Sequence, residues 1–306
     1  LAHICLPMSP GRSCPLHYRY APGVFARAAN IHAETIYVIG GLYGNLPALS
    51  AILELADAES IPPTLVFNGD FNWFNIDSVG FQTINREVLR HVALRGNVET
   101  ELAQHASAEG IAGCGCSYPD YVDDADVARS NTIMARLQET AYAFPDLTES
   151  LTSLPMHAVA EVGGSRFGVV HGDAESLAGW RFAHDGLHDP ANIAWLQQIC
   201  HDAKLAGFAS SHTCLPTFRR FADTGNGRIS VNPAGEGLSQ YGGMAGNVYV
   251  DAIPVHYDNE KFQRSFIENW PQGSAAHQSY FQRIVDGPAY TAPHAVGLIR
   301  APRVCA

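Results

Sequence analysis

The chain has 306 residues, of which 46% are hydrophobic and 16% are charged. This composition supplies enough apolar material for a large core and excludes an intrinsically disordered chain. The formal net charge is 19 − 30 = −11, which disfavours binding to a nucleic acid polymer or to an anionic membrane surface.

The cysteines and the N-terminal sequence indicate the compartment. Seven cysteines, an odd number without regular spacing, do not predict a disulfide framework. The first residues, LAHICLPMSPGRSC, lack the basic and long apolar regions of a secretory signal. No apolar stretch is long enough to span a bilayer. We therefore expect a cytoplasmic protein that does not bind membranes.

Short apolar runs and helical patterns alternate after an N-terminal arm over residues 1–34. Each apolar run ends in a polar turn that contains glycine, which is typical of strands in an α/β sheet with its site at the carboxyl ends of the strands. The pattern predicts strands at 36–39, 64–67 and 92–95, and helices that start at Pro47 and at about Phe81.

The rest of the chain continues the α/β pattern around a helical insertion at about residues 112–155. A hairpin is expected over residues 157–170, and a helix follows over 191–205. Further strands are expected at 207–210, 218–223 and 228–233. The main domain is expected to span 35–256, and residues 257–306 to form a C-terminal extension packed on the core, with a helix capped by Ser274.

Polar turns follow the predicted strands in a particular order: GGLYGN (40–45), NGD (68–70), RGNVE (95–99), VHGD (170–173) and SHTC (211–214), with VNPAGEG (231–237) behind them. Turns at strand ends converge in space although they are far apart in sequence. Convergence would bring together Asp70, Asn97, His171 and His212. This mixed oxygen and nitrogen set suits a divalent transition metal (Mn²⁺, Fe or Zn²⁺) better than Ca²⁺ or Mg²⁺.

This order of turns resembles that of the calcineurin-like metallophosphoesterases, whose pattern is D-x-H-(G-N), G-D, G-N-H-(D/E), H and G-H-x-H. The flanks agree: YGNLPALSAIL is similar to the start of the family's first helix, and VNPAGEG resembles its N-P-G-S-x-G turn. The resemblance covers roughly residues 35–255. It implies an α/β fold of four layers, an α-β-β-α sandwich of two mixed sheets with helices outside.

The chain departs from the family pattern at four positions. Gly41 and Tyr43 stand where the family has D-x-H, Val98 replaces the histidine after G-N, and Cys214 replaces the last histidine. The resemblance therefore implies that one metal site, made by Asp70, Asn97, His171 and His212, is intact. In the other site, only the bridging Asp70 remains.

The function that the resemblance implies is metal-dependent hydrolysis of a small phosphate mono- or diester at about one metal per chain, where a metal acts as a Lewis acid and acidifies water. Asp70, Asn97 and His212 are the expected catalytic residues. The expected substrate-binding groups are the backbone amides of the 40–45 turn and of the Asn97 loop, with the side chains of Tyr43, Asn45 and Arg95. A homo-oligomer is compatible with the sequence.

Alternatives remain open at the sequence level. The chain could be a catalytically inactive binding or scaffold protein, like the retromer subunit of this fold. Cys214, with the Tyr43 phenolate, could instead be a ligand, and a repurposed site should place both near the surviving metal. A redox or metal sensor would use the cysteines at positions 14, 114, 116 and 214.

Several side chains near these motifs have two interpretations each. Tyr43 either binds phosphate or fills the space of the absent metal. The FNWF run (71–74) either lines a pocket or packs in the core, and the tail aromatics cover a sheet edge or form a subunit contact. The carboxylates of Glu99, Asp173 and Glu236 either bind the metal themselves, or are solvated or support the ligands.

Overall fold

The computed structural model describes residues 10–12, 14–103, 113–221, 229–233, 238–245, 248–253, 255–287, 291–296 and 298. The strands are β1 (Ile31–Ala33), β2 (Ile36–Ile39), β3 (Thr64–Asn68), β4 (Val92–Leu94), β5 (His157–Val162), β6 (Ser165–Val170), β7 (Gly207–Ser210), β8 (Arg219–Phe221), β9 (Ile229–Pro233), β10 (Leu238–Ala245) and β11 (Val248–Ala252). The helices are α1 (Leu46–Asp57), α2 (Ser78–Val88), α3 (Asn97–Ala103), α4 (Asp124–Ala141), α5 (Pro145–Thr152), α6 (Pro190–Ala203), α7 (Asn259–Asn269), α8 (Ala275–Tyr280) and α9 (Ala292–Ala295).

The described strands form two larger sheets and one hairpin. Strands β2, β3 and β4 make a parallel sheet in that order. The other large sheet has the order β1-β5-β6-β7-β9-β8 and mixes parallel with antiparallel pairs. Strands β10 and β11 pair with each other. The predicted mixed α/β class is therefore confirmed.

Helix α1 shows how the first strand–turn–helix unit is fixed by its sequence. The Asn45 side chain accepts a hydrogen bond from Ala48 N (2.9 Å) and caps the helix, and Pro47 stands in the first turn, where its missing N–H costs nothing. The residues that α1 buries are spaced three and four apart: Ala48, Leu49, Ile52 and Ala56. They pack in one cluster with Leu65 and Phe67 of β3. Helix α1 is thereby held on the parallel sheet, as the apolar period predicts.

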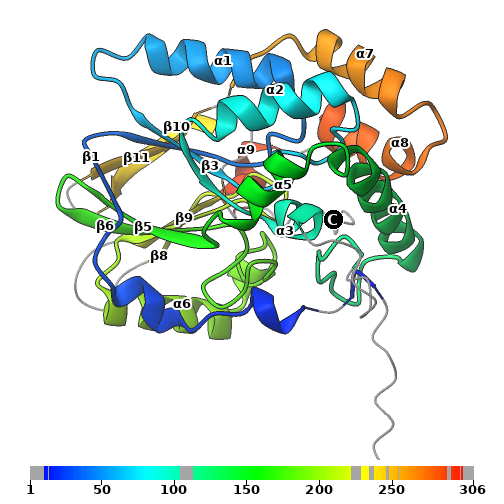
Figure 1. Cartoon of the computed structure of the whole chain (residues 1–306). Helices are drawn as coiled ribbons and strands as arrows, with labels where there is room; N and C mark the ends of the chain where they lie inside the picture. Colours follow the sequence, from blue (N-terminus) through cyan, green and yellow to red (C-terminus); the bar gives the residue numbers. More distant parts are fainter. Residues whose placement is uncertain are drawn as a thin grey trace, which may run out of the picture.

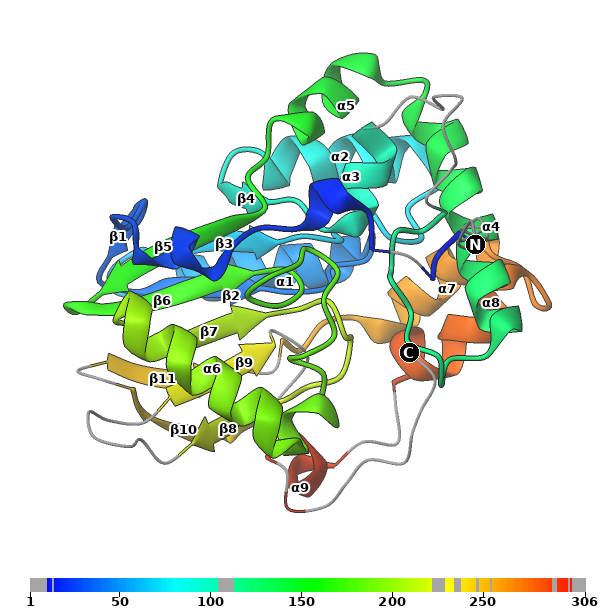
Figure 2. The same cartoon turned by 90° about the horizontal axis from the view of Figure 1, so that it is seen from below.

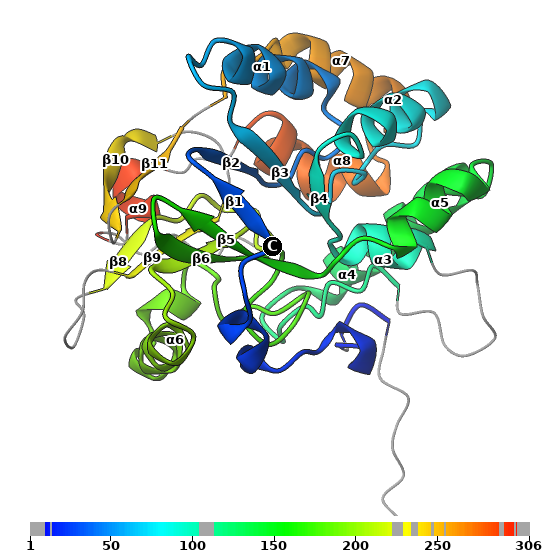
Figure 3. The same ribbon diagram turned by 60° about the vertical axis from the view of Figure 1, so that its left-hand side comes forward.

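The two larger sheets contact each other through aliphatic side chains. Val66 of β3 and Leu94 of β4 pack against Ala158 of β5 and Val169 of β6 in one cluster. Helix α6 packs on the other side of the six-stranded sheet, in a cluster with Phe208 of β7. Figure 1 shows α1 and α2 above the strands and α6 below them, and Figure 2 shows α6 lying across the strands. In Figure 3, β2, β3 and β4 lie between α1 and α2 on one side and β5 and β6 on the other.

The N-terminal arm is not only an extended lead into the core. Its last residues form β1, which runs parallel to β5 with Ile31 opposite Ala160. Asn30 holds the start of β1 beside β5, because its Oδ1 accepts a hydrogen bond from Val159 N (2.8 Å). The arm thus supplies an edge strand of the six-stranded sheet.

The C-terminal extension packs on the FNWF segment, so Phe74 lies in the core. Trp270 Nε1 donates to Phe74 O (2.8 Å), and the Phe74 ring meets those of Phe266 and Tyr280 at centroid distances of 5.3 and 5.2 Å. Helix α8 also packs against α4 of the predicted insertion. The N-cap predicted at Ser274 is confirmed, since its Oγ accepts from His277 N (3.4 Å).

Within the described part of the chain, no helix is long and apolar enough to cross a membrane.

Candidate metal centre

Four predicted site residues follow the carboxyl ends of four strands. Asp70 follows β3 and Asn97 follows β4 in the parallel sheet, whereas His171 follows β6 and His212 follows β7 in the other sheet. Because both pairs of strands are parallel, each sheet brings its two turns to one edge. Backbone hydrogen bonds from Ser211 N (3.0 Å) and His212 N (2.8 Å) to His171 O join the last two turns.

The four side chains converge on one point. His171 Nε2 lies 3.1 Å from Asp70 Oδ2, 3.1 Å from Asn97 Oδ1 and 3.2 Å from His212 Nδ1. All four residues are buried, and Asp70, His171 and His212 place one ligand atom each within 4.8 Å of one another. The structure therefore brings together the ligand set that the turns predict.

The hydrogen bonds behind these side chains show which atoms carry protons. His171 Nδ1 donates to Asn68 O (2.9 Å) and His212 Nε2 donates to Cys116 O (3.1 Å), because a backbone carbonyl can only accept. In the same way, Asn97 Nδ2 donates to Cys114 O (2.9 Å). The remaining atoms are His171 Nε2, His212 Nδ1, Asn97 Oδ1 and Asp70 Oδ2. With His171 neutral, all four turn lone pairs toward one another. Four buried acceptors without a donor between them fit a bound cation.

The pKa shifts agree with metal ligands. Burial alone would raise the pKa of Asp70, but the charge and hydrogen bond of His171 outweigh it, and this pKa is lowered. Burial and the His171 charge lower the pKa of His212 to about 4. Asp70 is therefore ionised and His212 neutral, the states that ligate metals. Burial lowers the pKa of His171, yet Asp70 raises it further, so a proton and a metal ion compete for Nε2.

The loops that carry Asp70 and Asn97 are held together by Glu99, a residue whose role the sequence left open. Glu99 is fully buried, and its carboxylate accepts from Asp70 N (2.7 Å), Gly96 N (3.0 Å) and Asn72 N (3.2 Å). Glycine at position 96 lets the two loops come this close together, since a Cβ there would lie 2.2 Å from Asp70 Oδ1. Burial and then the charge of Asp70 raise the pKa of Glu99 to about 7. Glu99 thus supports the ligands and is not solvated.

Replacing Glu99 by alanine is expected to lower the free energy of unfolding by about 2–3 kcal/mol, because three buried backbone N–H groups lose their acceptor. Urea unfolding should be measured at pH 6, below the raised pKa of Glu99. Glu99 is then mostly protonated, so removing its repulsion with Asp70 adds little to the stability of the variant. The control is Glu139→Ala on α4, a side chain that is 65% exposed and paired with Arg136, which we expect to change stability by less than about 0.5 kcal/mol. Equal stability of the two variants would contradict the role of Glu99.

Tyr43 and Cys214, at positions where the resemblance implies ligands of a second metal, contact each other. The Tyr43 hydroxyl lies 2.9 Å from Cys214 Sγ. A Cβ on Gly41 would lie 2.7 Å from the Cε2 and Cζ atoms of Tyr43, so the tyrosine ring occupies the space of an aspartate side chain at that position. Tyr43, Asp70 and Cys214 all have left-handed backbones, with φ of 50°, 55° and 61°. Such strain in non-glycine residues is concentrated at functional sites.

Cys214 lies outside the group of ligand atoms, although it is close to Asp70. Among the described residues, that group contains Asp70, His171 and His212. Burial raises the pKa of Cys214, and burial followed by the Cys214 charge raises the pKa of Tyr43. Both side chains are therefore neutral near pH 7. A Cys214 ligand stays a prediction, and the structure gives the sulfur a tyrosine partner.

Other predicted substrate-binding groups make internal hydrogen bonds. Asn45 caps α1 through its Oδ1. Arg95 Nη1 donates to Thr152 O (3.2 Å), on the side of the loop near α5. Binding of phosphate by these two side chains stays a prediction.

The expectation that the turn amides bind phosphate is wrong for three of them. Tyr43 N donates to Asp70 O (3.4 Å), Gly44 N to Phe71 O (3.0 Å), and Val98 N to Asp70 Oδ1 (3.1 Å). These bonds join the turns to each other, so the amides serve the architecture of the centre. The Asp173 carboxylate is likewise structural, because it accepts from Glu175 N (2.9 Å) and Ser176 N (3.0 Å) within its own turn. Glu236 lies outside the described residues.

The cysteines proposed for a sensor are distributed around the centre. Cys14 Sγ lies 3.1 Å from Ser176 Oγ, and Cys116 Sγ lies 3.5 Å from Asn97 Nδ2. Cys114 is buried, and these cysteines are free thiols. Within the residues that the structure describes, no cluster of metal-ligating side chains includes a cysteine.

Comparisons with known proteins were made in sequence and in structure. No family model matches the chain, and no curated protein matches it in sequence. In structure, 78% of the chain matches 95% of a hypothetical protein from Pyrococcus horikoshii OT3, with a TM-score of 0.49 and 18% identity. A metallophosphoesterase from Sphaerobacter thermophilus matches over 79% of this chain and 97% of its own, with a TM-score of 0.46 and 16% identity. A protein serine/threonine phosphatase from Saccharomyces cerevisiae matches over 70% and 74%, with a TM-score of 0.30 and 16% identity.

The function of this chain has to be argued from its own residues.

Proposed function

We propose that the chain is a metal-dependent phosphoesterase with one divalent transition metal, Mn²⁺, Fe²⁺ or Zn²⁺, held by Asp70, Asn97, His171 and His212. The observation that carries the proposal is the convergence of their four acceptor atoms. When both histidines are neutral, the protons of the histidines and the amide are directed away from the centre. One carboxylate, one amide oxygen and two imidazoles suit these metals. The proposal includes the four-layer arrangement of the calcineurin-like fold, which the helices on the outer faces of the two sheets support.

The protein residues have separate tasks in this proposal. Such a metal would act as a Lewis acid toward a phosphoryl oxygen and make a water molecule more acidic. The carbonyls of Asn68 and Cys116 fix the histidine rings so that a single nitrogen of each faces the centre. Glu99 holds the Asp70 and Asn97 loops in register.

The leaving group receives little help from this chain. Val98, at the place of the family's histidine, is buried and cannot donate a proton. A general acid contributes about 10²–10⁴-fold to a rate. We therefore propose that the favoured substrates are small phosphate esters whose leaving groups are acidic, such as phenols.

The test combines elemental analysis with hydrolysis of p-nitrophenyl phosphate and bis(p-nitrophenyl) phosphate. Protein purified without chelator should hold about one metal per chain, since four protein ligands form one site. Hydrolysis should disappear on chelation and return with Mn²⁺ or Zn²⁺. Two metals per chain would refute the mononuclear centre. Bound metal without hydrolysis of either ester would favour an inactive binding or scaffold protein, the alternative function.

A further inference from the structure

Two of the proposed metal ligands donate hydrogen bonds to one short loop, the C-G-C segment at residues 114–116. Asn97 Nδ2 donates to Cys114 O (2.9 Å), and His212 Nε2 donates to Cys116 O (3.1 Å). Asn97 follows a strand of the parallel sheet, whereas His212 follows a strand of the other large sheet. The carbonyls of this loop therefore orient ligands that come from both sheets.

Side chains from other segments hold the two ends of the C-G-C loop. The loop belongs to no helix or strand, so no regular hydrogen-bond pattern fixes its carbonyls. At one end, Cys114 N donates to Asn131 Oδ1 of α4 (3.0 Å). At the other end, the indole Nε1 of Trp180 donates to Cys116 O (2.9 Å). The carbonyl that orients the second histidine of the centre is thus held by a tryptophan.

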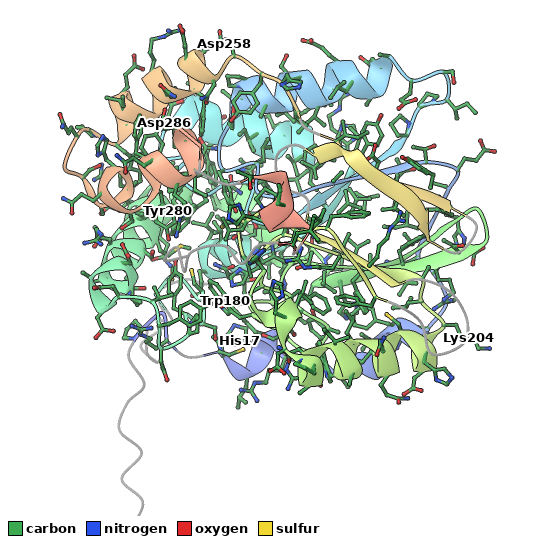
Figure 4. The ribbon with its side chains drawn as sticks, turned by 180° about the vertical axis from the view of Figure 1, so that it is seen from behind. His17, Trp180, Lys204, Asp258, Tyr280 and Asp286 are labelled. Carbon is green, nitrogen blue, oxygen red and sulfur yellow. The ribbon has the colours of Figure 1, made fainter. Side chains whose placement is uncertain are left out.

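Trp180 contacts both partners of the hydrogen bond between His212 and Cys116. Its N–H shares the Cys116 carbonyl with the His212 N–H, and the two lone pairs of a carbonyl oxygen can accept both. Its ring also meets the His212 ring edge-on, with centroids 5.3 Å apart and planes at 75°. Tyr118 lies 5.9 Å from the same indole and joins its hydroxyl to that of Tyr280 (2.6 Å); Figure 4 labels Trp180 and Tyr280. The half-buried indole therefore touches the imidazole and the group that orients it.

The segment that carries Trp180 is itself fixed to the turn that follows His171. Asp173 Oδ2 accepts a hydrogen bond from Arg181 N (3.2 Å). A Cβ on Gly179 would overlap the Asp173 carboxylate, so glycine lets the segment fold this closely onto the turn. The indole thus starts from a backbone that is anchored beside one histidine ligand, and it reaches the other.

We propose that Trp180 is a positioning residue of the metal centre, which holds the Cys116 carbonyl and the His212 ring so that His212 Nδ1 faces the metal. This inference rests on the metal centre of the proposed function and deepens it. Losing a hydrogen-bond partner directly behind a metal ligand costs about 10–100-fold in affinity or activity. Trp180 acts through the carbonyl and through its ring contact, so we expect an effect at the lower end of that range.

The test titrates the full chain, stripped of metal by a chelator, with Zn²⁺ in a calorimeter. Trp180→Phe keeps an aromatic ring without the indole N–H, and it should raise the Kd for Zn²⁺ by about 10-fold. The matched control is Trp195→Phe on α6, also a half-buried indole, whose N–H donates to Glu175 Oε1 (3.1 Å). It should bind Zn²⁺ like the wild type. Equal Zn²⁺ affinity in wild type and Trp180→Phe overturns the positioning role.

The visible spectrum of bound Co²⁺ separates positioning from a merely structural role. At saturating Co²⁺, the absorption bands should shift in Trp180→Phe and stay unchanged in Trp195→Phe, because a tilted imidazole changes the geometry around the ion. A raised Kd with unchanged Co²⁺ bands would show that Trp180 acts on stability alone.

A measurement on the wild type needs no variant that folds. Protein labelled with 5-fluorotryptophan gives one ¹⁹F signal for each of the four tryptophans. Zn²⁺ should shift the signal of Trp180 most, because its ring contacts a proposed ligand. Zn²⁺ binding that moves none of the four signals contradicts the inference.

The outcomes also separate this inference from the proposed function. Wild type that binds Zn²⁺ but hydrolyses neither ester would refute the phosphoesterase function, while the Kd of Trp180→Phe still decides the positioning role. Normal hydrolysis with equal Zn²⁺ affinity in wild type and Trp180→Phe would refute the positioning role alone. Wild type that binds no metal overturns both.

Discussion

Replacing Asp70 by asparagine is expected to reduce bound metal from about one ion per chain to nearly none, and to reduce hydrolysis by about 10³-fold or more. Losing a hydrogen-bond partner behind a metal ligand already costs about 10–100-fold in affinity or activity. Asp70 is itself a proposed ligand and is the only one of the four with a formal charge. Asparagine keeps its size, and an amide oxygen can still accept from Val98 N as Asp70 Oδ1 does.

The measurement is elemental analysis together with the p-nitrophenyl phosphate assay on the purified variant. The matched control is Asp202→Asn, an exposed aspartate on α6 whose side chain is 64% accessible and which belongs to none of these turns. It should keep wild-type metal content and activity. Asp70→Asn that retains its metal would show that the ion binds elsewhere and would remove the basis of the proposed function.

Much of the centre could be predicted because its information is local. Short β-branched runs such as Ile36–Ile39 predicted strands, and the turns that follow them carried Asp70, Asn97, His171 and His212. Strand ends in parallel sheets must meet at one edge, so the convergence followed from the order of the elements. The sequence could not show which nitrogen of each histidine faces the centre. That choice depends on the carbonyls of Asn68 and Cys116, which come from other loops.

Other features depend on packing between segments that are distant in sequence. Ile31–Ala33 is too short to show an alternation of apolar and polar residues. Its partner strand β5 comes after α1–α5 in the chain, so the pairing joins segments that are far apart in sequence. The single π-helical turn at Phe281–Val285 has no sequence signature here. The sequence indicated that positions 41, 43 and 214 had lost their ligands. It did not show that the tyrosine ring had taken the space of the site.

The position of the Tyr43 ring leads to a strong prediction about residue 41. Gly41→Asp alone should lower the free energy of unfolding by about 2–4 kcal/mol, since its Cβ would overlap the ring and a non-glycine residue would take a left-handed backbone. The distances are 2.7 Å to Tyr43 Cε2 and Cζ and 2.8 Å to its hydroxyl, at a Gly41 φ of 56°. Thermal or urea unfolding measures the loss. Gly23→Asp is a suitable control, because a Cβ there meets nothing within 4 Å.

The same aspartate should act as a metal ligand when residues 43 and 214 are changed with it. In the variant Gly41→Asp, Tyr43→His, Cys214→His, the histidine at 43 lacks the Cζ and hydroxyl atoms of the conflict, and the three new side chains rebuild the missing D-x-H and final histidine around Asp70. We therefore expect elemental analysis to give about two metals per chain for this triple variant. One metal per chain would mean that the tyrosine and the cysteine are not what dismantles the second site.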